Sequence, residues 1–143
     1  MSNVTTLQSM YEAFGRGDIP AIMEQVADEV EWEQWSDENS GQEAGVPWLM
    51  RRTGKQGGAE FFQAVGETLE FHAFQPENFL EGGNQVAVMI SFDGTAKETG
   101  ERFRGEEIHL WTFDDAGKVV GMRHYVDTAK HIRAAKGSLA RVT

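Results

Sequence analysis

Two histidines stand in segments whose other residues are typical of β-strands. His109 lies in the stretch EEIHLWTF and His124 in the stretch GMRHYV, and four residues (114–117, DDAG) between the two stretches predict a turn. An imidazole has an ordinary pKa of about 6.5, so it can act as a general acid or base near neutral pH. Ionisable groups in strands this apolar predict that their face of the sheet borders a wet pocket rather than a dry core.

The length of the turn decides whether the two histidines share a face. If residues 114–117 form the loop, His109 pairs with Met122 and is a diagonal neighbour of His124, about 7–8 Å away between backbones. A three-residue loop would shift the register and put the histidines on opposite faces. With the four-residue loop, one face carries His109, Trp111, Val120, Met122 and His124.

Three roles are open for this pair. Each imidazole can satisfy a backbone or carboxylate partner inside the core, or the pair can supply an acid, a base or a hydrogen-bond donor in a pocket. Metal binding is the weakest alternative, because the chain has no His-x-His or His-Glu-x-x-His spacing and no carboxylate that clearly completes a site. The sequence therefore predicts no metal. His72 and His131, the other two histidines, carry no signal of function.

Apolar periodicity predicts the elements that position the hairpin. Helices are expected at 4–14, 59–69 and 128–136, the last with Asp127 as N-cap. A further helix is expected after residue 18, with Asp18 as N-cap and with Ile22, Met23 and Val26 as its buried stripe. Strands are expected at 30–35, 70–81, 85–96, 102–113 and 118–126, the last four forming an antiparallel meander. The Gly-rich polar segment 36–58 predicts a long excursion. Together these predict one α+β domain over residues 1–143, with helices gathered on one face of a curved sheet.

Composition narrows the class of partner. The 143 residues carry a formal net charge of −10, which disfavours nucleic acid and anionic membrane surfaces. There is no cysteine, no apolar run of about 18 residues and no signal-like N-terminus, which fits a cytoplasmic protein. A neutral or weakly polar small molecule is the expected partner, with no nucleic acid, no membrane and no cofactor.

Four stretches, YEAFGRGD, VADEVEWEQW, GGAEFFQAV and EEIHLWTFDDAGKVVGMRHYVD, resemble the SnoaL-like branch of the nuclear-transport-factor-2-like (NTF2-like) superfamily. The resemblance spans nearly the whole chain. It implies a cone-shaped fold with three N-terminal helices packed on a curved, mostly antiparallel sheet, a short C-terminal helix, and a homodimer joined through the outer sheet face. The superfamily includes ketosteroid isomerases, polyketide cyclases and limonene-epoxide hydrolases, so the fold alone does not specify the reaction.

The ketosteroid isomerase pattern transfers poorly. Its carboxylate base falls on Gln34, which cannot take a proton, and its oxyanion-hole tyrosine falls near Met10, with Tyr11 one residue away. Its oxyanion-hole aspartic acid falls on His109. The resemblance therefore does not imply steroid isomerisation by the familiar mechanism.

The limonene-epoxide hydrolase pattern also transfers incompletely. Its water-activating aspartate falls on His124, and the tyrosine and asparagine that hold the water fall on Trp32 and Gln34. Its Arg-x-Asp pair falls on or near Ile90 and Phe92. Both comparisons still lead to the two histidines already singled out, with Gln34 nearby.

These observations predict a cofactor-independent enzyme of isomerase, cyclase or hydrolase type, acting on a small apolar polyketide-, terpenoid- or steroid-like molecule. His124 is expected to act as base or water activator and His109 as acid or oxyanion donor. The expected substrate-binding residues, with Trp48 as a lid from the excursion, are Trp32, Gln34, Trp48, Trp111 and Met122. Two alternatives remain, a non-catalytic ligand-binding protein and an accessory protein whose role is dimer-mediated association.

Overall fold

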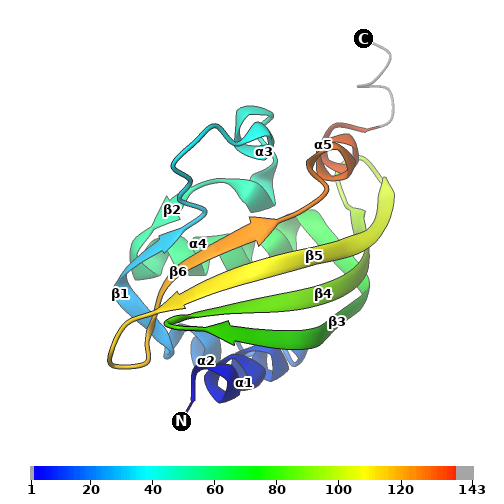
Figure 1. Cartoon of the computed structure of the whole chain (residues 1–143). Helices are drawn as coiled ribbons and strands as arrows, with labels where there is room; N and C mark the ends of the chain where they lie inside the picture. Colours follow the sequence, from blue (N-terminus) through cyan, green and yellow to red (C-terminus); the bar gives the residue numbers. More distant parts are fainter. Residues whose placement is uncertain (1, 138–143) are drawn as a thin grey trace.

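A strongly curved sheet of six strands wraps around helices in the computed structural model, which describes residues 2–137 (Figure 1). The sheet order is β2-β1-β6-β5-β4-β3. The strands are β1 (Val26–Trp32), β2 (Arg52–Thr53), β3 (Leu69–Gly82), β4 (Gln85–Ala96), β5 (Arg102–Phe113) and β6 (Val119–Tyr125). The helices are α1 (Asn3–Gly15), α2 (Ile19–Met23), α3 (Ser40–Glu43), α4 (Gly54–Thr68) and α5 (Thr128–Lys136), with a 3₁₀ turn at Pro47–Leu49.

The predicted α+β class is confirmed, and so are most helices. Asp18 caps α2 through a hydrogen bond from the Ala21 N–H, and Asp127 caps α5 through one from the Lys130 N–H. Helix α4 begins five residues before the predicted start at residue 59. The prediction was wrong for Val26, which does not belong to α2 but opens β1.

The meander β3–β6 was predicted correctly, but the sheet does not end there. Strand β1 pairs with β6 in parallel and with β2 in an antiparallel arrangement. The expected excursion 36–58 is largely ordered into α3, the 3₁₀ turn, β2 and the first turn of α4. This segment and α5 lie together at one end of the sheet, while α1 and α2 lie at the other end (Figure 1).

The hairpin register differs from the prediction by two residues. His109 pairs directly with His124, rather than with Met122, and the ladder is irregular between Thr112 and Phe113. Because Phe113 pairs with Val119, one residue of β6 is left over near the turn. This extra residue forms a β-bulge, which brings Val119, the first residue of β6, to the buried face. The sequence does not reveal the bulge, because the rest of the strand keeps its alternation. The histidines share a face, as predicted.

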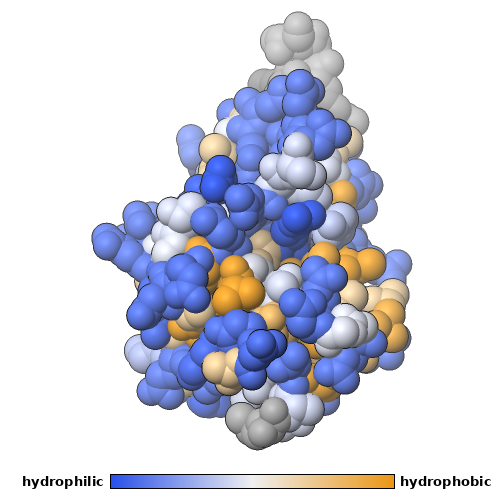
Figure 2. Space-filling model, turned by 60° about the vertical axis from the view of Figure 1, so that its left-hand side comes forward, coloured by the Kyte–Doolittle hydropathy of each residue, from blue (hydrophilic) through white to orange (hydrophobic). Residues whose placement is uncertain are grey.

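The apolar residues of the helices and of the inner sheet face form one core. On the face drawn in Figure 2 the surface is mostly hydrophilic, and the apolar side chains that reach it gather in the lower half. No helix among residues 2–137 is long and apolar enough to cross a membrane. The ends of the predicted 1–143 domain, residue 1 and residues 138–143, lie outside the described residues.

Candidate functional site

A cavity of about 70 Å³ lies between the helices and the inner face of the sheet. Six of the seven predicted site residues line it, namely Trp32, Trp48, Trp111, Met122, His109 and His124. Gln34 does not, because it is exposed at the surface. Most of the remaining lining is aromatic or aliphatic, including Tyr11, Phe14, Phe62, Phe71 and Phe74. The cavity therefore combines an apolar wall with a small number of ionisable groups.

Gln34 is displaced because the strand alternation breaks at Glu33. This residue has φ of 60°, a left-handed conformation that non-glycine residues rarely adopt. The turn places Glu33 on the buried side directly after Trp32, and both side chains are fully buried. The carboxylate at this position is therefore Glu33, one residue before the position to which the family pattern pointed.

Glu33 holds His124 from two directions. One carboxylate oxygen accepts hydrogen bonds from the backbone N–H of His124 at 2.5 Å and from its ring Nδ1 at 2.9 Å. The other oxygen accepts one from the Trp35 indole N–H at 3.2 Å. Burial lowers the pKa of His124, but the hydrogen bond and charge of Glu33 outweigh burial and raise the pKa above its ordinary value. Since Nδ1–H is donated to Glu33, Nε2 is the ring nitrogen left for chemistry.

His109 belongs to a separate chain of hydrogen bonds. The Trp111 indole N–H donates to the Tyr11 oxygen at 2.9 Å, Tyr11 lies 2.7 Å from His109 Nδ1, and His109 Nε2 lies 2.6 Å from a Glu107 oxygen. Burial raises the pKa of Tyr11, so its O–H stays protonated and donates to Nδ1. Burial and the neighbouring His124 lower the pKa of His109, so a neutral ring donates its Nε2–H to Glu107.

His131 supports Glu107 from helix α5. The Trp48 indole N–H donates to His131 Nδ1 at 2.9 Å, which leaves the His131 proton on Nε2. His131 Nε2 lies 3.7 Å from the second oxygen of Glu107. Burial lowers the pKa of His131 to about 4, so this ring is neutral near pH 7. The histidines around Glu107 also hold the pKa of this buried carboxylate well below its usual range.

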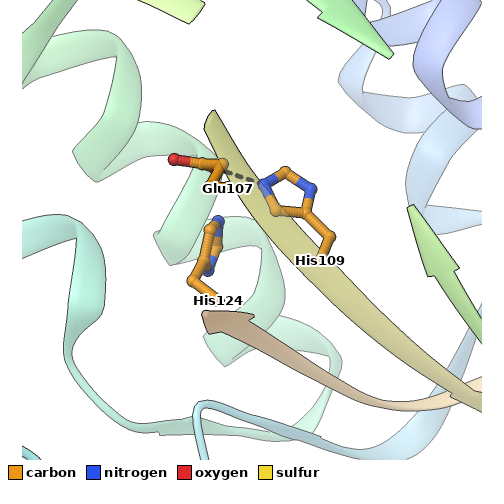
Figure 3. A group of neighbouring side chains, drawn as sticks. All are labelled: Glu107, His109 and His124. Atoms are coloured by element: carbon orange, nitrogen blue, oxygen red, sulfur yellow. Dashed lines mark hydrogen bonds and ion pairs between the residues drawn. The ribbon is translucent and has the colours of Figure 1, made fainter. Parts of the chain in front are cut away.

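Glu107, His109 and His124 meet at one point of the cavity wall (Figure 3). One potential ligand atom from each residue lies within 4.8 Å of the other two. The rings of His109 and His124 are 4.4 Å apart between centroids, and the side chains of all three residues are almost completely buried. Such a group can donate and accept protons, or it can hold a metal ion.

Comparison with known proteins identifies the family. Residues 7–122 match the family model of the SnoaL-like domain, which is most of the chain. The protein belongs to the SnoaL-like family. No curated protein matches the sequence.

Solved structures agree with this SnoaL-like assignment. An NTF2-like protein of unknown function from Burkholderia pseudomallei is 27% identical, with a TM-score of 0.78 over 96% of this chain and 100% of its own. A protein from Mesorhizobium loti, described as a candidate SnoaL-like polyketide cyclase, is 25% identical, with a TM-score of 0.68 over 88% of this chain and 100% of its own. TerC, crystallised with polyporic acid, is 23% identical and supports the fold alone, with a TM-score of 0.74 over 94% of this chain and 98% of its own.

Sequence reasoning missed four residues of this SnoaL-like site, which are Tyr11, Glu33, Glu107 and His131. Tyr11 had a signal in the family pattern, which fell one residue away from it. Glu107 shares a strand face with His109 by alternation, so its spacing could have marked it. Nothing local distinguishes His131, because its burial depends on α5 packing against Trp48 and Phe103.

Proposed function

We propose that this SnoaL-like protein is an enzyme that transfers protons to and from a small, largely apolar molecule, with His124 as the base. The observation that carries the proposal is the Glu33–His124 pair. Glu33 fixes the Nδ1–H tautomer and leaves Nε2 as a proton acceptor at the cavity wall. A carboxylate behind an imidazole also stabilises the cation that forms when the ring takes a proton.

The second histidine supplies the complementary role. His109 is neutral and donates its Nε2–H to Glu107, so it offers this hydrogen bond or proton to a substrate oxygen that takes the place of the Glu107 carboxylate as acceptor. Tyr11 and Trp111 hold the ring in this tautomer from behind. The two imidazoles therefore differ in environment, which is how neighbouring groups divide into a base and an acid.

The lining favours an aromatic or terpenoid-like substrate. The indole N–H of Trp32 is, within residues 2–137, the one fully buried side-chain nitrogen or oxygen without a hydrogen-bond partner. An oxygen of the substrate beside Trp32 would satisfy this donor. A cavity of about 70 Å³ admits only a very small molecule, whereas pockets for drug-sized ligands measure about 300–1,000 Å³. A polyketide-sized ligand must therefore displace half-buried aromatic rings such as Phe71 and Phe74.

A thermal-shift screen tests this proposal. Wild-type protein is heated with steroids, terpenoid epoxides, aromatic polyketides and single-ring phenols, and hits are then assayed for turnover. A ligand at 100 times its Kd stabilises the fold by about 2.7 kcal/mol, or roughly 5–10 °C. His124→Gln and His109→Gln should abolish turnover with the fold intact, while His72→Gln, at an exposed position, should not. Ligand binding without turnover in wild type would favour the non-catalytic alternative.

We also propose that the protein forms a homodimer through the outer sheet face. Ile108 and Tyr125 pair across β5 and β6 on this face, and both are more than a third exposed. Trp35 packs against Tyr125 at 5.0 Å between ring centroids. Replacing Ile108 and Tyr125 by arginine should convert the dimer to a monomer in sedimentation equilibrium, and a wild-type monomer would contradict the proposal.

A further inference from the structure

We infer that Glu107, His109 and His124 form a binding site for a divalent transition-metal ion. Two imidazole nitrogens and one carboxylate oxygen are a donor set that zinc and iron(II) accept. The three donors come from neighbouring positions on β5 and β6, and His109 and His124 are cross-strand partners. The inference goes beyond the proposed function and does not depend on it.

Each donor residue has its own supporting partner from another element. Glu33 accepts from His124 Nδ1, Tyr11 contacts His109 Nδ1, and His131 lies against the second oxygen of Glu107. Histidines that bind a metal through one nitrogen typically use the other one in this way, which fixes the ring and raises its basicity.

The geometry requires only small adjustments. At bonds of about 2.0–2.2 Å, ligand atoms around a tetrahedral ion are about 3.3–3.6 Å apart. The three donor atoms already lie within 4.8 Å of one another, so shifts of about 1 Å in side-chain position close the site. Binding through His109 Nε2 moves its proton to Nδ1, where the Tyr11 oxygen can accept the hydrogen bond. The adjoining cavity leaves room for a water molecule as the fourth ligand.

Charge also favours a cation here. Glu33 and Glu107 bring two carboxylates into a site from which water is largely excluded. No lysine or arginine is among the residues that line the cavity. Buried charges are costly unless they are compensated, and one divalent ion would neutralise both carboxylates. The ion would also occupy Nε2 of His124, so zinc should inhibit the proton transfer proposed above.

Isothermal titration of the full-length, chelator-treated protein with zinc chloride tests the site. We expect one zinc ion per chain, and we expect Glu107→Gln, His109→Gln and His124→Gln each to weaken binding at least 100-fold. Glu33→Gln removes only a supporting partner and should weaken binding about 10–100-fold. His72→Gln is the matched control at an exposed position and should bind as wild type does.

Cobalt(II) provides a readout that does not depend on variants that fold poorly. Cobalt in a four-coordinate site gives strong visible absorption. Zinc should displace the cobalt ion from wild-type protein at a ratio of one to one, and the absorption should then disappear. Circular dichroism checks that each variant is folded. Failure of wild type to bind either ion, or binding that the three substitutions leave unchanged, would overturn the inference. Neither measurement uses a substrate, so its result is independent of the proposed enzymatic activity.

Discussion

Tyr11→Phe removes a single oxygen from the centre of the buried hydrogen-bond chain. The hydroxyl oxygen accepts a hydrogen bond from the Trp111 indole N–H at 2.9 Å, and the O–H donates one to His109 Nδ1 at 2.7 Å. Phenylalanine preserves the ring and therefore its packing against Phe74 and Phe79. The substitution thus isolates the hydrogen bonds from the shape of the core.

The cost follows from the groups left behind. The indole N–H of Trp111 and Nδ1 of His109 would both lose their partner, and these residues are 4% and 5% exposed. An unsatisfied buried polar group costs about 1–3 kcal/mol, and removal of the desolvated tyrosine hydroxyl returns part of that cost. We expect a loss of about 3 kcal/mol in the free energy of unfolding. For a chain of this size that corresponds to a fall of roughly 6–12 °C in Tm.

Urea denaturation followed by tryptophan fluorescence, together with calorimetry, measures this loss. Tyr125→Phe is a matched control, because Tyr125 is the only other tyrosine and is 41% exposed. We expect the control to change stability by less than about 0.5 kcal/mol. If Tyr11→Phe is no more destabilising than Tyr125→Phe at the same protein concentration, the chain through His109 does not stabilise the fold, and the assigned tautomer of His109 loses its support.

Four further substitutions test other parts of the structure. In helix α4, Gly66→Ala should raise the free energy of unfolding by about 0.5–1 kcal/mol, because the added Cβ has no atom within 4 Å. Gly57→Ala should lower it, because the added Cβ would lie 3.1 Å from the Arg52 side chain. Equilibrium unfolding compares the two variants. Glu33→Gln should lower the free energy of unfolding in urea by about 2–4 kcal/mol, since an amide cannot accept all three N–H groups that the carboxylate accepts; equal stability would contradict the network. The pKa of His131 is about 4 in the folded protein and about 6.5 in the unfolded chain, so between these pH values the unfolded chain binds more protons. The free energy of unfolding should therefore fall as pH drops from 6.5 towards 4, by at most about 3 kcal/mol. His131→Phe should flatten the dependence of unfolding free energy on pH in this range, and an unchanged slope would refute the assignment.

The fold was predictable because its strongest signals are local. Alternating apolar residues gave the bounds of β4 and β5 correctly, and Asp18 and Asp127 marked the starts of two helices. The excursion 36–58 was harder, because its short elements are stabilised by tertiary contacts. Trp48, for example, is buried through contacts with Phe103 and His131, which are more than fifty residues away.

The candidate site was only half predictable, because its two carboxylates have different kinds of signal. Alternation places Glu107 on the face of His109, so strand periodicity contains the information. Alternation places Glu33 on the opposite side from Trp32, and only the backbone turn at φ of 60° reverses this. A strand rule cannot anticipate such a turn, since its conformation is unfavourable for glutamate in isolation.

The cost of that turn bears on why the cluster is polar. A strained backbone costs about 1–3 kcal/mol, and burial of a carboxylate adds a further penalty that hydrogen bonds only offset. Apolar residues in place of a buried ionic group are often neutral or stabilising, so stability alone does not account for Glu33, Glu107 and their histidines. Glu107 and these histidines line a cavity whose other walls are mostly aromatic or aliphatic, and Glu33 lies directly behind His124. A cluster that is costly to fold and that borders a cavity is better explained by what it binds or reacts with than by what it contributes to the core.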